Sequence, residues 1–336
     1  MLDRDGISLI YLYELRQPSI SLFAFLIIFC QCDNKQLPVQ LPTGVKNYMD
    51  ITVALAQIKP KLGSVPDNLD LIERSIERAV AEKADLVVFP ELALTGYFLK
   101  DLVPEVALTL DSPEVARLKK LSRSISIAVG FVEAAMGYQF FNAALYLEQG
   151  EIKHLHRKVY LPTYGLFDEQ RYFSHGWQFR AFNTRLGPIG MLICEDMMHP
   201  SAPYILALDG ATTILCLASS PARGVEEGDE PSSTTIWRTQ TSSAALSFNC
   251  NVLFCNRVGV EEGIVLWGGS EAVLPSGKRC ASAALFEEDF VLARLEEKVL
   301  RRERIHFPVL RDENLSLTLR ELQRIEWRKE QPCQNS

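Results

Sequence analysis

Residues 189–200 have the sequence IGMLICEDMMHP, and the fold is best read outward from them. In this stretch an apolar run is followed by a single cysteine and then by a polar turn. Residues 189–193 have the composition of a buried strand, and the carboxylates of Glu195 and Asp196 end it. Cys194 therefore stands where the strand ends. A cysteine in mid-strand is usually a small hydrophobic residue, whereas one at a strand-to-helix turn can be partly exposed near backbone N–H donors. This stretch alone leaves a reactive role and a packing role equally open.

Strand and helix patterns alternate on both sides of this stretch. Residues 51–58 and 86–89 predict strands, and a helix between them is predicted to start with Asp67 as its N-cap and to bury Leu69, Ile72, Ile76 and Val80. Such alternation implies largely parallel sheet buried on both faces. Antiparallel returns near Gly150 and Gly277 make the sheet mixed. We find no linker after residue 49, so residues 49–336 are expected to form one large α/β domain with a charged C-terminal tail.

Composition limits the classes of partner and site. The formal net charge of -7 argues against a polyanion-binding surface, so no nucleic-acid partner is expected. The eight cysteines include no CxxC pair, and Cys216 and Cys255 lie in apolar runs typical of core residues. The five histidines show no metal-ligand spacing, so no metal site is predicted. Cysteines without a disulfide framework favour a reducing cytoplasm.

Residues 1–48 differ from the rest of the chain. Residues 19–29 are an apolar stretch that is too short to span a bilayer and closer in length to a signal-peptide core. The acidic residues beside it remove the expected positive bias. We therefore expect the folded domain, and with it the natural start, near Met49, with no membrane association of this domain. A cleaved or anchoring leader, which would make the protein exported or membrane-anchored, is the alternative.

Three further polar residues share the placement of Cys194, just beyond an apolar strand. Glu91 follows Val-Val-Phe-Pro, Lys158 follows the predicted strand at 152–156, and Glu169 lies in the loop 163–173. The ends of strands in α/β sheets form the usual crevice for ligands. Each residue by itself is more typical of a solvated loop or a helix cap, so only their combination carries weight.

Together these residues stand in three ordered motifs that resemble the nitrilase, or carbon–nitrogen hydrolase, superfamily. The motifs are FPELALTGY at 89–97, RKVYLP at 157–162 and GMLICED at 190–196. The resemblance extends from about residue 51 to residues 267–270 and the strands after them. Tyr97, Tyr164 and the Cys194 turn most resemble the glutaminase domain of glutamine-dependent NAD synthetases. Without the synthetase domain or a Ser-Gly-Gly phosphate-binding motif, we expect a stand-alone domain that does not itself amidate an adenylated acid.

The resemblance implies a four-layer α-β-β-α sandwich with mixed sheets and a triad of Glu91, Lys158 and Cys194. It also implies that Glu169, eleven residues after Lys158, is the second glutamate found in many members. No cofactor is implied. Many members form dimers through the sandwich, so a homodimer or a higher homo-oligomer is expected.

The substrate pocket is predicted from family position. Tyr97, Tyr164 and Met198 are expected to be walls, and residues 219–223 are expected to lie close by, including Ser220. Arg223 would suit a carboxylate-bearing substrate through a bidentate pair. A solvated loop charge explains this arginine equally well.

The residue types also suit amide cleavage on chemical grounds. A free thiol with a pKa near ~8.5 is mostly protonated at neutral pH, so the nucleophile Cys194 needs a base, for which Glu91 is the candidate. Lys158 and the backbone N–H of Glu195 are the predicted stabilisers of the oxyanion, and one such donor is typically worth ~10²- to 10³-fold in rate. We therefore expect hydrolysis of a small-molecule linear amide or carbamoyl amide through a cysteine thioester, with Glu169 as the orienting residue.

Three alternatives remain at this point. An amine instead of water could resolve the thioester, which would make the protein an acyltransferase. A nitrile could be the substrate, although many nitrilases have Trp where this chain has Glu195. The fold could also serve as an inactive interaction module, which the four suitable residues at the reactive positions disfavour.

Overall fold

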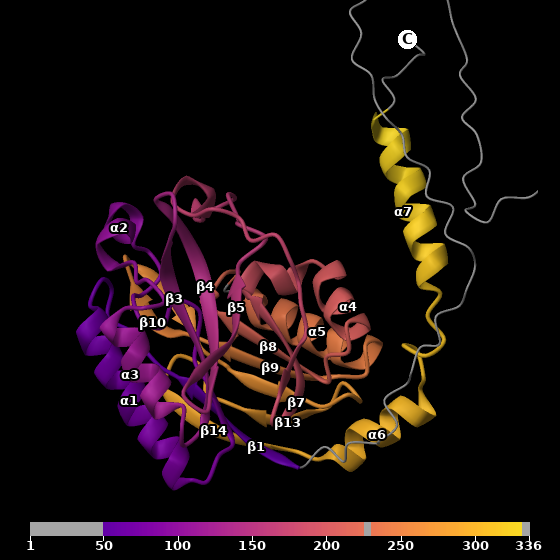
Figure 1. Cartoon of the computed structure of the whole chain (residues 1–336), viewed down its shortest axis with the longest axis horizontal. Coiled ribbons are helices and arrows are strands. Elements are labelled where there is room, and N and C mark those ends of the chain that lie inside the picture. The colour runs from indigo at the N-terminus through magenta and orange to yellow at the C-terminus, as the bar shows by residue number, and fades with distance from the viewer. Residues whose placement is uncertain (1–49, 225–229, 331–336) are drawn as a thin grey trace, which may run out of the picture. The chain divides into compact units, whose positions relative to one another are not determined.

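The computed structural model describes residues 50–224 and 230–330, and they belong to a single structural unit spanning residues 47–336. The proposed leader at residues 1–48 lies outside the described residues. Within these ranges, strands and helices follow one another much as the sequence patterns predict, and they build two sheets with helices on their outer faces (Figure 1).

Each sheet has six strands and mixed direction. The first sheet has the order β14-β1-β2-β3-β4-β5, with bounds Asp289–Leu295, Ile51–Gln57, Leu86–Val88, Ser126–Ala135, Gln139–Glu148 and Glu151–Arg157. The second has the order β13-β12-β9-β8-β7-β6, with bounds Arg279–Ser282, Glu271–Val273, Asn251–Asn256, Thr213–Ala218, Gly187–Ile193 and Phe182–Thr184. Strands β1, β2 and β3 are parallel, as are β7, β8 and β9, and the other pairings are antiparallel. The predicted antiparallel returns at Gly150 and Gly277 are confirmed.

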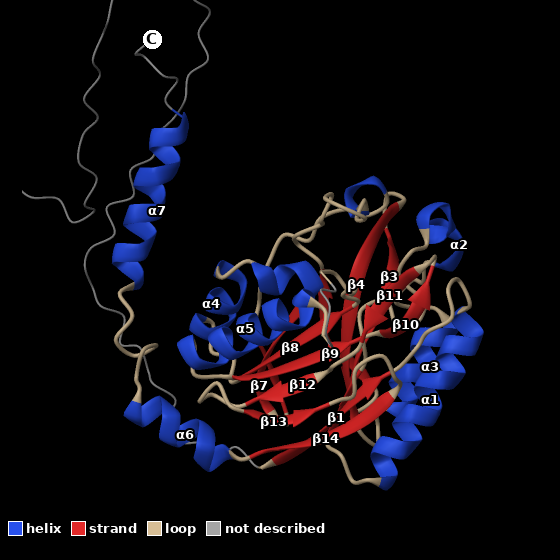
Figure 2. Ribbon diagram, turned by 180° about the vertical axis from the view of Figure 1, so that it is seen from behind, coloured by secondary structure: helices blue, strands red, loops and turns tan. Residues whose placement is uncertain are grey.

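The longer helices that precede the C-terminal tail lie on the outer faces of the sheets (Figure 2). Helices α1 (Val65–Ala81) and α3 (Pro113–Leu121) cover the first sheet, and α4 (Ser201–Leu208) and α5 (Ser232–Ser247) cover the second. Short elements connect these layers: the hairpin β10 (Val258–Glu261) and β11 (Ile264–Trp267), helix α2 (Val103–Val106), and the 3-10 turns η1 (Lys100–Leu102), η2 (Glu169–Arg171) and η3 (Cys194–Met198). The tail forms α6 (Glu297–His306) and α7 (Leu315–Glu330).

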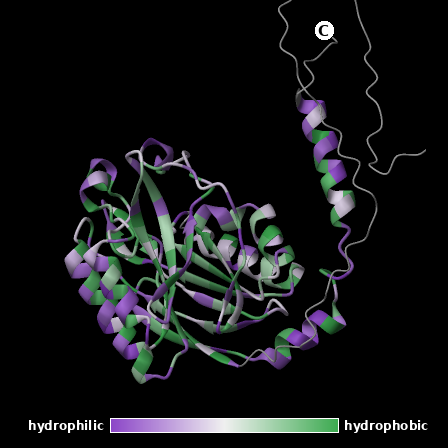
Figure 3. Cartoon of the chain, viewed as in Figure 1, coloured by the Kyte–Doolittle hydropathy of each residue, from purple (hydrophilic) through white to green (hydrophobic). Residues whose placement is uncertain are grey.

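Strand β1 illustrates why the sheets are buried on both sides. Val53 and Leu55 belong to the core between the two sheets, whereas Ala54 and Ala56 belong to the core under α1 and α3. Successive side chains of a strand point to opposite faces, so a continuous apolar run fills both cores at once. The predicted four-layer α-β-β-α sandwich is confirmed. Figure 3 shows the sheet strands as largely hydrophobic and the outer helices as mixed.

Helix α1 corrects two details of the sequence-based prediction. Ser64 is the N-cap, not Asp67, which lies in the first turn and accepts a hydrogen bond from the Ser64 hydroxyl at 2.8 Å. Val80 is exposed, and Ala79 takes the inward position instead. At 100° per residue, positions 79 and 80 both lie roughly 50° from the mean direction of Leu69, Ile72 and Ile76, on opposite sides of it, so the helical repeat alone does not decide which of the two is buried.

The direction of the strands places their carboxyl ends at common edges. Strand β5 is antiparallel to β4, which is antiparallel to β3, so β5 runs in the same direction as β2 and β3. The segments after β2 and β5 therefore leave the first sheet at one edge, where ligand crevices of α/β sheets form. Among the described residues, no helix is both long enough and apolar enough to cross a membrane.

Candidate active site

Glu91 is placed by a tight crossing of the chain over β3. After β2, the segment 90–92 passes so close to Gly130 that a Cβ there would lie 2.4 Å from the backbone nitrogen of Leu92. Only glycine allows this approach. Glu91 is 1% exposed, and its Oε1 accepts a hydrogen bond from Nδ2 of Asn142 at 2.7 Å. Its backbone oxygen accepts one from the Ser219 hydroxyl at 3.0 Å, which ties the first sheet to the second.

Lys158 follows directly after β5 and is fully buried. Its backbone N–H donates to the Asn142 carbonyl at 2.8 Å, and its own carbonyl accepts from Gly176 at 2.7 Å. Its Nζ lies 2.8 Å from Oε1 of Glu91 and 2.6 Å from Oε1 of Glu169. One ammonium therefore joins two buried carboxylates that would otherwise repel each other.

Glu169 begins the 3-10 turn η2 and is 5% exposed. Its backbone N–H donates to the carbonyl of Pro162 at 3.1 Å, and its Oε1 accepts from Lys158 and from the Tyr97 hydroxyl. We call Glu91, Lys158 and Glu169 the charged cluster. The Oε2 atoms of both its carboxylates have no hydrogen-bond partner among the described residues, so each keeps one oxygen available for a substrate, a water molecule or a thiol proton.

Cys194 lies at the end of β7 and starts the 3-10 turn η3. Its φ of +46° is uncommon for a residue with a side chain and marks a sharp change of chain direction at the nucleophile candidate. The turn is held by buried Asp196, which accepts backbone N–H bonds from Ile193, Val159 and Tyr160. Asp196 also contacts Nε2 of His156 at 2.8 Å. The same carboxylate therefore holds the cysteine turn against the segment that carries Lys158.

The charges of these groups determine the resting state. Burial and the carboxylate of Glu91 raise the pKa of the Cys194 thiol well above its usual value, against the opposing charge of Lys158. Burial alone would lower the pKa of Lys158, but Glu169 and Glu91 outweigh it and raise that pKa. Burial raises the pKa of Glu169 to about 7, although Lys158 acts to lower it. At neutral pH the thiol is therefore protonated and the lysine is charged.

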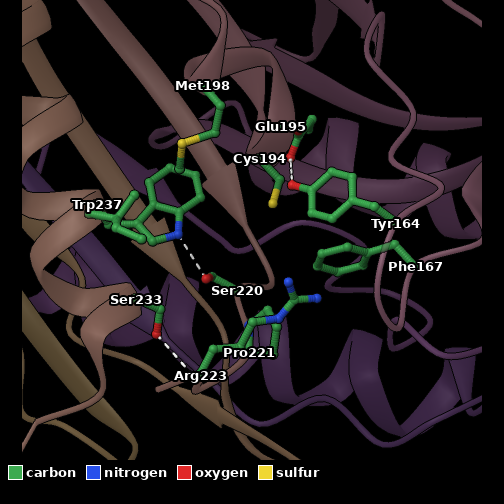
Figure 4. A pocket seen from close by; sticks show the side chains of 11 residues that line it. Tyr164, Phe167, Cys194, Glu195, Met198, Ser220, Pro221, Arg223, Ser233 and Trp237 are labelled. Carbon is green, nitrogen blue, oxygen red and sulfur yellow. Dashed lines mark hydrogen bonds between the residues drawn. The ribbon is translucent and has the colours of Figure 1, made fainter. Parts of the chain in front are cut away.

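Cys194 is also part of a cavity wall (Figure 4). We call this cavity, of about 140 Å³, the Cys194 cavity; it is lined by Tyr164, Phe167, Cys194, Glu195, Met198, Ser220, Pro221, Arg223, Ser233, Ile236 and Trp237. Figure 4 shows the sulfur of Cys194 and the guanidinium of Arg223 both turned towards the middle of the cavity. The thiol therefore faces a space that a small substrate can enter.

The two polar ends of the cavity carry opposite charges. The guanidinium of Arg223 lies 4.8 Å from the centre of the Phe167 ring, and its Nη2 has no hydrogen-bond partner within the described ranges. On the other side, the Glu195 carboxylate accepts a hydrogen bond from the Tyr164 hydroxyl at 2.8 Å. Burial and Glu195 raise the pKa of Tyr164 to about 12, so this hydroxyl remains a donor. A ligand in this cavity thus meets one cation and one anion.

The structure brings most of the candidate residues together. Tyr164, Glu195, Met198, Ser220 and Arg223 all line the Cys194 cavity, and the charged cluster lies behind the thiol. Tyr97, expected as a wall, lies instead behind Glu169 and lines a neighbouring cavity of about 320 Å³. Its contact with the expected site therefore runs through the Glu169 carboxylate.

Several residues at the site were not singled out from the sequence. Asn142 and Asp196 hold Glu91 and the cysteine turn, and Phe167 and Trp237 form aromatic walls. An asparagine inside the apolar run 142–147 was a usable signal, because a polar residue in a buried strand needs a partner. The aromatic residues gave no signal, since such residues most often fill cores. Within residues 50–224 and 230–330, no group of three or more His, Cys, Asp or Glu side chains could hold a metal ion.

Comparison with known proteins gives independent evidence on the family of this chain. A family model described as carbon-nitrogen hydrolase matches residues 52–304. A glutamine-dependent NAD(+) synthetase of Synechocystis sp. is 33% identical over 260 residues, covering 72% of this chain and 45% of that protein. The chain thus spans less than half the length of this curated relative.

Solved structures show the same fold. The glutamine-dependent NAD+ synthetase of Acinetobacter baumannii, in complex with ADP, superimposes with a TM-score of 0.67 at 28% identity, covering 75% of this chain and 46% of that one. A carbon-nitrogen hydrolase of Helicobacter pylori gives a TM-score of 0.72 at 24% identity and covers 81% of this chain and 98% of that one. This chain therefore has the fold of nearly the whole of the Helicobacter pylori structure.

Proposed function

The chain belongs to the carbon-nitrogen hydrolase family, and from this premise we propose that it is an amidase that acts through a thioester on Cys194. The observation that carries the proposal is the position of the thiol. Cys194 lines a cavity, while Glu91, Lys158 and Glu169 all act on the pKa of its thiol from behind. The nucleophile is thus in the wall of a space that can hold an amide, and a base and a cation are close enough for their charges to act on its thiol.

The first half of the proposed reaction makes the thioester. Because the thiol is protonated at rest, its proton passes to Glu91 as the sulfur attacks the amide carbon. The free Oε2 of Glu91 is the atom available for this proton, since Oε1 already accepts from Asn142 and Lys158. Lys158 and the backbone N–H of Glu195 stabilise the oxyanion. The proton then goes to the leaving nitrogen, and ammonia or an amine departs.

The second half releases the acid. A water molecule takes the vacated place, gives a proton to Glu91 and attacks the thioester carbon. The intermediate collapses to a carboxylic acid and the Cys194 thiolate, which recovers a proton from Glu91 and becomes the thiol again. Throughout both halves Lys158 remains charged and Glu169 holds it in place at 2.6 Å, so the role of Glu169 is to position the cation.

For the substrate we propose a small ω-amide of an amino acid, of the glutamine type. The support is the pair of opposite charges in the Cys194 cavity: Arg223 suits a carboxylate and Glu195 suits an ammonium. The relatives named as glutamine-dependent enzymes point the same way. Small amides without these groups would then react more slowly.

Intact-mass spectrometry tests the chemistry. The wild-type protein is mixed with glutamine and other small amides, beside Cys194→Ala and the matched control Cys280→Ala, which removes an exposed cysteine outside the cavity. We expect ammonia release and a transient acyl adduct in the wild-type and the control, and neither in Cys194→Ala. Turnover that survives in Cys194→Ala would show that the thioester route is wrong.

A second experiment tests the substrate class with three amides that share the same chain from the amide group to the α-carbon. Glutamine carries both charged groups, 4-aminobutanamide lacks the carboxylate, and glutaramate lacks the ammonium. Arg223→Met is expected to raise KM for glutamine by about 10- to 100-fold and to leave 4-aminobutanamide unaffected, because a charge-assisted bond is lost only for the former. Exposed Arg180, changed to Met, is the control. Equal effects on all three amides would refute the assignment of Arg223 to the carboxylate.

A further inference from the structure

A second buried ion pair lies outside the charged cluster. Arg257, between β9 and β10, is 1% exposed and pairs with Glu261, which is 5% exposed. The Arg257 guanidinium also donates to the carbonyl of Pro60 at 2.8 Å. Desolvating two charges is costly unless further hydrogen bonds compensate, so a pair at this depth needs a structural or functional reason.

The other carboxylate oxygen of Glu261 accepts hydrogen bonds from the loop that follows Glu91. Its Oε1 accepts the backbone N–H groups of Tyr97 at 2.8 Å and Phe98 at 2.6 Å. Gly96 permits this approach, because it has a φ of +80° and a Cβ there would lie 2.8 Å from Oε2 of Glu261. The ion pair therefore holds the backbone of Tyr97 from one side.

The side chain of Tyr97 reaches the charged cluster on the other side. Its hydroxyl donates to Oε1 of Glu169, the same oxygen that accepts from Lys158. Tyr97 is 8% exposed and packs edge-on against Phe98, with ring centres 5.0 Å apart. A continuous series of contacts thus runs from Arg257 through Glu261 and Tyr97 to Glu169.

We propose that Arg257 and Glu261 position Tyr97, and through it the carboxylate of Glu169, for the reaction at Cys194. Neither residue of the pair touches the Cys194 cavity, so both are positioning residues. This inference rests on the proposed function in one respect, which is that Glu169 takes part in the proposed reaction. Loosening the pair would let the Tyr97 hydroxyl leave Glu169, which would weaken the placement of Lys158 without changing the substrate contacts.

A double-mutant cycle tests the series of contacts. The variants are Glu261→Gln, Tyr97→Phe and the combination of both. The control is Glu262→Gln, whose side chain is 49% exposed and pairs with Lys100 at 3.3 Å on the surface. We expect each single change to lower kcat by about 10-fold with little change in KM, because misplacement affects the reacting groups and not the substrate walls. The combination is expected to lose no more than the larger single change, and the control to stay within about twofold.

A second readout does not depend on turnover. The rate at which iodoacetamide alkylates Cys194, followed by peptide mass spectrometry, is measured against pH. The Tyr97 bond favours the ionised form of Glu169, so its loss is expected to move the inflection due to Glu169 upward by about 0.5 to 1 pH unit. Both single variants and the combination should show the same shift. If no amide is hydrolysed even by the wild-type protein, this profile still tests the inference separately from the proposed function.

Two outcomes would overturn the inference. Losses of kcat that multiply to about 100-fold in the combination would mean that Glu261 and Tyr97 act independently. An unchanged alkylation profile in Glu261→Gln, with only a lower unfolding midpoint, would mean that the pair serves stability alone. If Glu261→Gln fails to fold because Arg257 is left unpaired, Arg257→Met combined with Glu261→Gln removes the buried charge as well, and the same cycle is run in that background.

Discussion

The two sides of Cys194 are built on different principles. Behind the thiol lies the charged cluster, in which Glu91, Lys158 and Glu169 are at most 5% exposed and are joined by Nζ–Oε1 distances of 2.8 and 2.6 Å. In front lies the Cys194 cavity, whose walls include Tyr164 at 52% exposure. Charges at low dielectric interact strongly, whereas those at a solvated wall are screened. We therefore expect larger effects of substitution behind the thiol than in front of it.

The largest effect is expected for Lys158→Met. This change leaves the carboxylates of Glu91 and Glu169 buried next to each other without a cation and removes a stabiliser of the oxyanion. We expect kcat/KM for amide hydrolysis to fall by at least about 10³-fold and the free energy of unfolding to fall by about 3 to 5 kcal/mol. Steady-state kinetics and urea unfolding measure the two effects.

Lys153→Met is the matched control for this prediction. Lys153 lies on the same strand, β5, and pairs with Glu151 at 2.7 Å near the surface. Pairs at the surface contribute little, so both quantities should stay close to those of the wild-type protein. If Lys158→Met kept more than a tenth of the wild-type kcat/KM for amide hydrolysis, the expected contrast between the charged cluster and the Cys194 cavity would be wrong.

The pH dependence of stability is the next largest effect. Glu169 has a folded-state pKa raised to about 7 from an ordinary value of 4.5, because burial disfavours its charge. A group with a raised folded-state pKa stabilises the fold fully below the unfolded-state pKa and loses that contribution as pH rises through the folded-state value. Between about pH 4.5 and 7, the wild-type protein should therefore lose up to about 1.4 kcal/mol of unfolding free energy per pH unit from this one group.

Glu169→Gln isolates this contribution because glutamine does not ionise. The unfolding free energy of the variant minus that of the wild-type protein should increase as pH rises from 4.5 to 7, by a few kcal/mol in total. Chemical unfolding at half-unit pH steps measures it, with Asp168→Asn, an exposed neighbour, as the control. A difference that stays constant or decreases with pH would show that Lys158 keeps Glu169 charged throughout.

The contrast between the charged cluster and the Cys194 cavity also explains which parts of the site could be predicted from the sequence. Glu91, Lys158 and Cys194 each follow shortly after the end of a strand, and the direction of the strands alone brings such ends to common edges. Polar partners such as Asn142 and Asp196 were within reach of the same reasoning, because polar groups in buried strands require partners. The alternation of strands and helices predicted one α/β domain with a mixed sheet, and the four layers of the sandwich came from the family resemblance.

The cavity was harder to predict because it is made by long-range packing. Phe167 comes from the loop 163–173 and Trp237 from α5, and neither has a local pattern that distinguishes a wall from a core residue. Tyr97 shows the limit most clearly. Its position in the glutamate motif indicated proximity to the site, but only the folded chain shows that its hydroxyl donates to Glu169 and that it lines a cavity other than the Cys194 cavity.

The smallest effect is expected for Tyr164→Phe, which removes one hydroxyl from the solvated side. The lost bond is the 2.8 Å contact with Glu195, whose other oxygen keeps a contact with His199 at 3.9 Å. A single hydrogen bond at a partly exposed site is worth about 0.5 to 1 kcal/mol, which corresponds to a two- to fivefold increase in KM with kcat nearly unchanged. Steady-state kinetics with glutamine measures the change in KM, and Tyr138→Phe, at a surface-exposed tyrosine, is the control. A loss of kcat near 100-fold would place Tyr164 in the same class as Lys158, and the cavity would then be as pre-organised as the charged cluster behind it.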